Sequence, residues 1–116
     1  MAKEFFYTLS KNEPLNTLER IISNFKLRNS IFKLRFVTDL TDTINLYKNL
    51  SFLFDEFNFN SQFETRLTYP DLRNFLSKFF MFIKSNKITS DIKIDIEAGD
   101  MKIKILDKDK KIVVEE

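Results

Sequence analysis

The chain has 116 residues and a formal net charge of +2, with no cysteine, no histidine and a single glycine. The lack of cysteine excludes disulfides and thiolate chemistry, and the lack of histidine removes the commonest general base and transition-metal ligand. Phosphate-binding loops need several glycines close together, so this composition also excludes motifs of that kind. We therefore expect a protein without enzymatic activity, cofactor or bound metal.

The first half of the chain predicts two strands, each followed by a helix. Residues 5–10 are expected to form a strand, and NEP at 12–14 is expected to begin a helix that ends near Asn29, because proline is tolerated in a first helical turn. Residues 31–38 alternate apolar and basic side chains, as a half-buried strand does. TDLTD at 38–42 offers capping side chains for a second helix. The residues expected to be buried on these helices are Leu15, Leu18, Ile22 and Phe25, and Leu46, Leu50, Leu53 and Phe57.

The second half predicts a strand, a helix and a strand meander. Residues 59–69 alternate throughout, which predicts a strand, and Pro70 then begins a third helix. The only glycine, Gly99, is expected at a hairpin tip with Ala98, because a tight turn favours a residue with positive φ. In that register Ile96 lies opposite Met101 and Asp95 opposite Lys102, and a second turn at 107–110 places Ile105 opposite Ile112. The third helix has the strongest apolar periodicity in the chain, on Leu72, Phe75, Leu76, Phe79 and Ile83.

The expected order of elements is βαβαβα followed by a C-terminal antiparallel β-meander. Each expected strand has one apolar and one polar face. This argues against a doubly wound parallel sheet, whose strands are apolar on both faces. We therefore predict a single α+β domain over residues 1–116, with the helices packed on one face of the sheet.

Basic residues gather between positions 20 and 38, where no acidic residue occurs. Either they are solvated, or they form an electrostatic surface for a partner. For the second interpretation the contact residues are Lys26, Arg28, Lys33 and Arg35. Reversing Lys33 and Arg35 to Glu is then expected to abolish partner capture without lowering thermal stability. The same surface is the best argument for nucleic-acid binding, but the aromatic residues of that strand lie on its buried face, away from the basic side chains.

Apolar residues on the third helix extend beyond its core stripe. Phe80, Met81 and Phe82 are the additional ones. Large exposed apolar patches mark interfaces, so these three residues are candidate partner anchors. The competing interpretation is a helix buried on two sides within the monomer.

A metal-dependent nuclease is a third, less favoured hypothesis. Asp100 and Lys102 have the Asp-x-Lys spacing of many such enzymes, and Asp71 and Asp91 offer further acids. Triplets of this kind arise by chance in a chain rich in lysine and acidic residues. A metal site also needs another converging acid, which the sequence does not identify.

These observations favour a small binding protein that occupies the surface of a macromolecular partner, such as an inhibitor, antitoxin or immunity protein. The residues favoured by AT-rich codons are abundant, which suits a phage-encoded inhibitor of a bacterial defence system of the anti-CRISPR kind. The same bias discounts the fourteen phenylalanines as a functional sign. The alternative is an accessory protein that binds nucleic acid through the basic residues.

The sequence also leads us to expect a cytoplasmic protein without a membrane partner. Its N-terminal residues lack the long apolar segment of a signal peptide, and no apolar run is long enough to cross a bilayer. An edge strand and the wide apolar surface of the third helix permit a homodimer.

Overall fold

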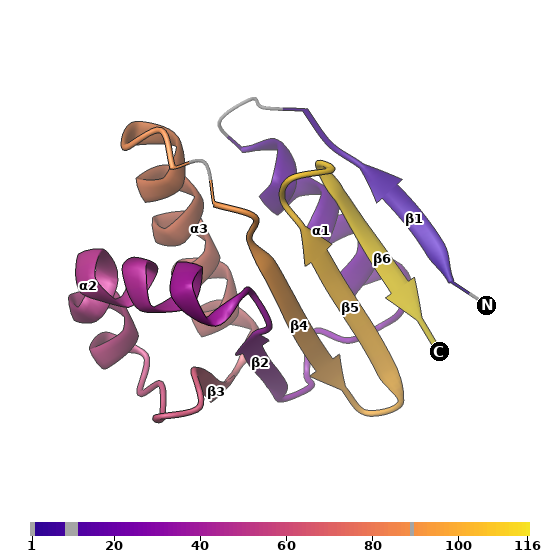
Figure 1. Ribbon diagram of the computed structural model, residues 1–116. Helices are drawn as coiled ribbons and strands as arrows, with labels where there is room; N and C mark the ends of the chain where they lie inside the picture. Colours follow the sequence, from indigo (N-terminus) through magenta and orange to yellow (C-terminus); the bar gives the residue numbers. More distant parts are fainter. Residues whose placement is uncertain (1, 9–11, 89) are drawn as a thin grey trace.

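The computed structural model describes residues 2–8, 12–88 and 90–116 and has the expected order of elements (Figure 1). The strands and helices are β1 (Lys3–Phe6), α1 (Glu13–Asn24), β2 (Phe32–Phe36), α2 (Leu40–Glu56), β3 (Glu64–Leu67), α3 (Tyr69–Ser85), β4 (Lys93–Ala98), β5 (Met101–Leu106) and β6 (Lys111–Glu115). The prediction of an α+β fold that ends in a β-meander is confirmed.

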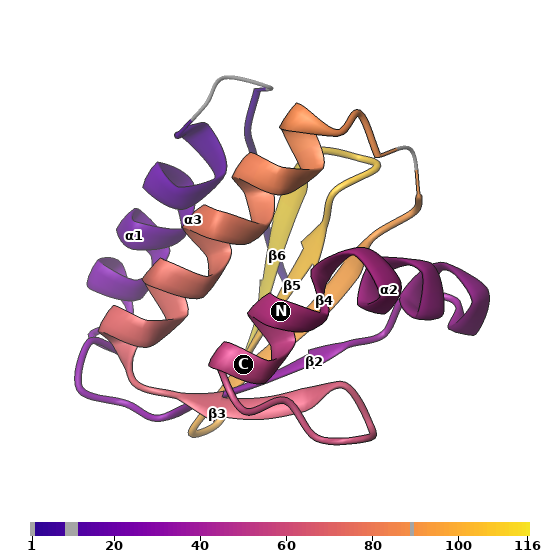
Figure 2. The same cartoon turned by 90° about the vertical axis from the view of Figure 1, so that its left-hand side faces the viewer.

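The six strands form one open sheet in the order β1-β6-β5-β4-β2-β3, and all neighbouring pairs are antiparallel. The three helices lie on one face of it, as expected, with α3 between α1 on one side and α2 on the other (Figure 2). The covered face carries the buried side chains Phe32, Leu34, Phe36, Ile94, Ile96, Ile103, Ile105, Ile112 and Val114. The opposite face, which no described helix covers, is rich in charged residues.

The turn between β4 and β5 differs from the prediction by one position along the chain. Ala98 lies opposite Met101, so the two turn residues are Gly99 and Asp100. Gly99 has a φ of +59°. A glycine at the first of two turn residues is the feature of the type II′ hairpin, whose twist matches that of the flanking strands.

This turn shifts the β4–β5 register by two residues. Ile96 therefore lies opposite Ile103 rather than Met101, and the predicted pairing of Asp95 with Lys102 is wrong. A shift of two preserves the face on which each side chain lies, so the isoleucines remain in the core. The predicted β5–β6 register is confirmed, with Ile105 opposite Ile112.

The strand expected over residues 59–69 is much shorter in the structure. The side chain of Asn60 accepts hydrogen bonds from the backbone N–H groups of Gln62 and Glu64, at 2.9 and 3.1 Å. Phe63 has a φ of +57°, which a strand does not adopt. Phe59 and Phe63 pack against the core from this turn, and their spacing imitates the alternation of a strand.

The ends of the first strand and helix also differ from the prediction. β1 covers Lys3–Phe6 rather than 5–10, and residues 9 and 10 lie outside the described part of the chain. α1 ends at Asn24, because Lys26 has a φ of +57° and the N–H of Leu27 bonds back to the carbonyl of Ile22 at 2.9 Å. A residue in the left-handed conformation commonly ends a helix in this way.

Aromatic rings join the sheet to the two C-terminal helices. The ring of Phe36 on β2 contacts four others, with centroids 5.2 to 6.2 Å away. Those rings belong to Phe54, Phe59, Phe75 and Phe79, and most of the contacts are edge-to-face, the arrangement that aromatic pairs favour. Apart from Phe6 and Phe52, every phenylalanine is buried or packs against the core. The abundant phenylalanines therefore have a structural role.

Candidate functional site

The four basic residues predicted to form a contact set lie in two separate places. Lys33 and Arg35 project from β2 onto the open face of the sheet, because the alternate residues of the strand fill the core. Lys26 and Arg28 belong to the connection between α1 and β2. The guanidinium of Arg28 lies 6.0 Å from the ring centroid of Tyr69, at the start of α3 and on the helix side of the sheet. The structure therefore does not bring the four together.

Acidic and basic residues are interspersed across the open face, and they alternate from strand to strand except where Arg66 lies opposite Lys33. One row holds Glu64, Arg35, Asp95 and Lys104, and the next holds Arg66, Lys33, Glu97, Lys102 and Glu115. Lys33 lies 3.6 Å from Glu64, and Lys104 lies 3.5 Å from Glu115. Proteins that bind single-stranded nucleic acid use a continuous, positively charged groove that runs along its backbone. This face, as described, is instead a mosaic of both charges. The geometry thus weakens the nucleic-acid hypothesis.

The three apolar residues predicted as partner anchors are mostly internal. Phe80 is buried, and Phe82 is partly buried against the core. Met81 alone among them is exposed, at 53% of its maximum. For Phe80 and Phe82 the structure therefore favours the second interpretation, in which the helix is buried on two sides.

The acidic residues considered for metal binding are dispersed. Asp71 lies in the first turn of α3, Asp91 pairs with Lys93 at 3.7 Å, and Asp100 lies in the hairpin turn. Within the described ranges, no three acidic residues lie close enough together to hold a metal ion.

A surface that sequence analysis missed lies on α2, where three large apolar side chains point outward. Leu40 is 66% exposed, and Ile44 and Tyr47 are each 42% exposed. Positions i, i+4 and i+7 lie in one line along a helix, so these residues form a continuous strip, the α2 stripe. The ring of Tyr47 stacks on the buried Phe54, with centroids 5.7 Å apart and planes at 15°.

The spacing of the α2 stripe was visible in the sequence. It was missed because Leu40 falls within the capping sequence TDLTD, and because the helix already has a second apolar set that accounts for its burial. The capping prediction itself is confirmed, since the Asp39 carboxylate accepts hydrogen bonds from the backbone N–H groups of Thr41 and Asp42, at 2.9 and 3.4 Å.

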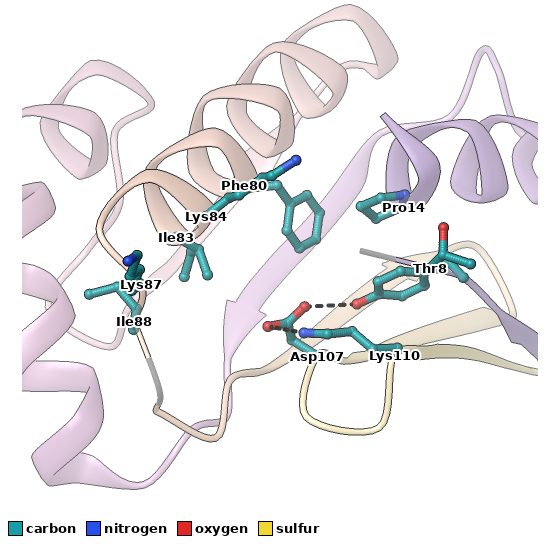
Figure 3. Close-up of a pocket in the computed structure, with 10 residues that line it drawn as sticks. Thr8, Pro14, Phe80, Ile83, Lys84, Lys87, Ile88, Asp107 and Lys110 are labelled. Atoms are coloured by element: carbon teal, nitrogen blue, oxygen red, sulfur yellow. Dashed lines mark hydrogen bonds and ion pairs between the residues drawn. The ribbon is translucent and has the colours of Figure 1, made fainter. Parts of the chain in front are cut away.

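A pocket of about 290 Å³ lies where four parts of the chain meet (Figure 3). These parts are the residues after β1, the start of α1, the end of α3 and the turn between β5 and β6. Its apolar lining residues are Pro14, Phe80, Ile83 and Ile88, and its polar ones include Tyr7, Lys84, Lys87, Asp107 and Lys110. We call this cavity the α3 pocket.

The floor of the α3 pocket contains a buried polar group, Asp107, which is only 9% exposed. Its Oδ1 accepts a hydrogen bond of 2.9 Å from the Tyr7 hydroxyl, and its Oδ2 lies 3.1 Å from Lys110 Nζ. Burial raises the pKa of Tyr7 strongly, and the neighbouring Asp107 charge raises it further. Tyr7 therefore remains a protonated donor at neutral pH. The contact fixes the β5–β6 turn against the chain that leaves β1.

Comparison with protein-family models, with curated proteins and with solved structures finds no match for this chain. Among the described residues, no helix combines the length and apolarity that crossing a membrane requires. The surfaces that distinguish the molecule are thus the charge mosaic, the α2 stripe and the α3 pocket. Of these, the α2 stripe is the one that leaves a line of large apolar side chains in contact with water.

Proposed function

We propose that the protein is a non-enzymatic binding protein that acts in the cytoplasm by occupying the surface of a protein partner. The class that suits this role is an inhibitor or accessory protein, such as an anti-defence protein of a phage, an immunity protein or an antitoxin. The observation that supports the proposal is the α2 stripe, formed by Leu40, Ile44 and Tyr47.

The α2 stripe has the geometry used when one protein places a helix in the groove of another. Anchors at i, i+4 and i+7 are typical of that mode of recognition. Each apolar side chain that leaves water on binding contributes roughly 25 cal/mol per Å² of buried area. Tyr47 is already held by its stacking on Phe54, so little side-chain freedom remains for this residue to lose on binding.

The charges around the stripe favour a protein over a nucleic acid. Asp39 and Asp42 lie at the N-terminal end of α2, beside Leu40. Acidic residues there repel phosphate but suit a groove that has a basic residue at its rim. On the open face, acids lie opposite Arg35 on both neighbouring strands and opposite Lys33 on β4. A partner with an apolar groove and a basic rim therefore fits best.

The test is affinity capture from nuclease-treated host lysate with three forms of the protein. The first is the wild type, the second carries Leu40→Ser and Ile44→Ser in the stripe, and the third carries Asn45→Ser and Asn49→Ser. The third is the matched control, because Asn45 and Asn49 are exposed on the same helix but outside the stripe. Mass spectrometry then identifies the proteins that each form retains.

We expect a partner that the wild type and the control retain and the stripe variant loses. All three forms should unfold at similar temperatures, because the substituted side chains are exposed. Retention by all three forms would contradict the assignment of the stripe, and recovery that disappears on nuclease treatment would favour nucleic-acid binding. Light scattering of the purified wild type shows whether the partner is instead a second copy of the chain.

A further inference from the structure

The α3 pocket combines an apolar interior with an excess of positive charge. Three lysines and one aspartate are among its lining residues, which gives a net charge of +2 from 3 − 1. Lys110 is paired with Asp107, so the excess rests on Lys84 and Lys87. Neither has an acidic partner within 4 Å among the described residues. The pocket thus has two uncompensated cations at its edge.

These two lysines follow the apolar wall along the same end of α3. Phe80, Ile83 and Lys84 lie within three or four residues of one another on α3, which places them on one side of the helix. Lys87 follows the end of the helix with a φ of +49° and also lines the pocket. Figure 3 shows Phe80 and Ile83 projecting from the helix toward Asp107. The wall therefore changes from apolar to cationic toward the C-terminal end of the helix.

The dipole of α3 does not account for both lysine charges. A helix C-terminus has the effect of about half a negative charge, whereas Lys84 and Lys87 contribute two positive ones. About 1.5 positive charges therefore remain to attract an anion. Such an anion avoids the floor of the pocket, where the carboxylate of Asp107 lies.

From these features we propose that the α3 pocket binds a small amphipathic anion, a carboxylate with a short apolar chain or ring. The apolar part lies between Pro14, Phe80 and Ile83, and the carboxylate lies at the edge beside Lys84 and Lys87. The volume of about 290 Å³ equals that of about ten water molecules in the liquid, so the ligand is a medium-chain or single-ring acid. None of the lining residues belongs to α2, so this site is separate from the α2 stripe.

The experiment is an NMR titration of the ¹⁵N-labelled protein with octanoate, hexanoate and octylammonium. Octanoate and octylammonium have eight carbon atoms each and opposite charges, and hexanoate is two methylenes shorter than octanoate. We expect saturable octanoate shifts confined to the residues that line the pocket. Each buried methylene should tighten binding about fourfold, so hexanoate should bind more weakly by up to roughly fifteenfold.

Two variants test the charged edge. Lys84→Gln with Lys87→Gln should weaken octanoate binding about tenfold, because it removes the charge-assisted hydrogen bonds to the carboxylate. Lys102→Gln with Lys108→Gln removes the same charge from exposed positions outside the pocket, and it should change the affinity less than twofold. Leu40→Ser with Ile44→Ser should bind octanoate as the wild type does, which separates this test from that of the α2 stripe.

Three outcomes would overturn the proposal. The first is an octanoate titration that does not saturate at millimolar concentrations or that shifts residues over the whole surface. The second is equal affinity for octanoate and octylammonium, which would show that charge has no part in binding. The third is an unchanged octanoate affinity in the variant that lacks Lys84 and Lys87.

Discussion

The hydroxyl of Tyr7 donates a hydrogen bond of 2.9 Å to Oδ1 of Asp107, which follows it by 100 positions in the sequence. The backbone N–H of Tyr7 also donates to the carbonyl of Lys110, again at 2.9 Å. Both contacts connect the chain after β1 to the β5–β6 turn, one of them through a buried carboxylate. The edge strand β1 is thereby held to the meander at a point beyond its own ladder with β6.

Removing the Tyr7 hydroxyl should destabilise the protein. We expect Tyr7→Phe to lower the free energy of unfolding by about 1–3 kcal/mol, because Oδ1 of the buried Asp107 then loses the hydrogen bond from the Tyr7 hydroxyl, and only Oδ2 keeps its contact with Lys110. Urea unfolding followed by circular dichroism measures this change. The control is Tyr47→Phe, which alters a half-exposed ring and should change the stability by no more than about 0.5 kcal/mol. Equal effects of the two substitutions would contradict the structural role of the Tyr7–Asp107 contact.

The raised pKa of Tyr7 predicts a loss of stability in alkali. In the folded state the Tyr7 phenol stays protonated at pH values above 10, the ordinary pKa of a tyrosine. The contribution of Tyr7 is therefore complete below about pH 10 and falls as the pH rises further, because the unfolded chain then releases a proton that the folded chain retains. The loss from this one group approaches about 1.4 kcal/mol per pH unit.

Comparison with the Tyr7→Phe variant isolates this contribution. The pKa of Tyr69 is also raised, first by burial and then by Glu19, but Tyr69 and all the lysines are common to both proteins. The stability difference between wild type and variant should therefore be constant near neutral pH and shrink above about pH 10. Urea unfolding at a series of pH values measures it, and a difference that does not shrink would show that the pKa of Tyr7 is not raised.

Much of the fold could be predicted because the strongest sequence patterns coincide with burial. The five apolar residues predicted to be buried on α3, including Phe75 and Phe79, are all buried. Apolar residues that recur about every 3.6 positions over a long segment indicate the buried face of a helix. The sequence determines the register of the β4–β5 hairpin less well. Gly99 indicates a turn but not whether it is the first or second of two turn residues, and registers that differ by two bury the same side chains.

The functional surfaces were harder to predict, because they depend on contacts between distant parts of the chain. Lys33 and Arg35 form a basic pair within their own strand, but three of their four partners across the sheet are acids, namely Glu64, Asp95 and Glu97. The Tyr7–Asp107 contact likewise joins two ends of the sequence that no local pattern relates. The α2 stripe is different, since its spacing is local and a search for a second apolar set on the helix finds it.

The charge mosaic changes what is expected when Lys33 and Arg35 are reversed. In the structure Arg35 lies opposite Asp95 and Glu64, and Lys33 lies opposite Glu97 and Arg66. Substituting both with Glu places like charges directly across from one another in three of these four pairs, at a cost of roughly 0.2–1 kcal/mol for each, and only the pair with Arg66 gains an opposite charge. The expectation from sequence alone, that this double variant keeps its stability, therefore has to be revised.

A charge swap tests the mosaic. Adding Glu64→Lys to the Lys33→Glu and Arg35→Glu variant restores an opposite charge between β2 and the edge strand β3, where Glu64 lies opposite Arg35 and 3.6 Å from Lys33. The three-residue variant should recover part of the lost stability, by an amount that shrinks in concentrated salt because these side chains are in contact with solvent. Thermal unfolding at low and high salt measures this recovery, and its absence would show that the alternating rows do not interact.

The aromatic core predicts a contrast between two phenylalanines. Phe75 is fully buried and contacts the rings of Phe36, Phe54, Phe57, Phe59 and Phe79, whereas Phe52 is exposed. Phe75→Ala should lower the free energy of unfolding by about 3–5 kcal/mol, because it leaves a cavity among these rings. Phe52→Ala should change it by about 0.5 kcal/mol or less.

Urea unfolding of the two variants makes the comparison, since both remove the same atoms from the same residue type. A loss of about 3–5 kcal/mol is a substantial part of the stability of a small domain, so Phe75→Ala should unfold at a much lower urea concentration than the wild type. A loss below about 1 kcal/mol would contradict the packing of this ring. It would also favour a bias of codon composition, rather than packing, as the reason for the abundant phenylalanines. Truncating a residue that packs the core lowers the stability of the protein.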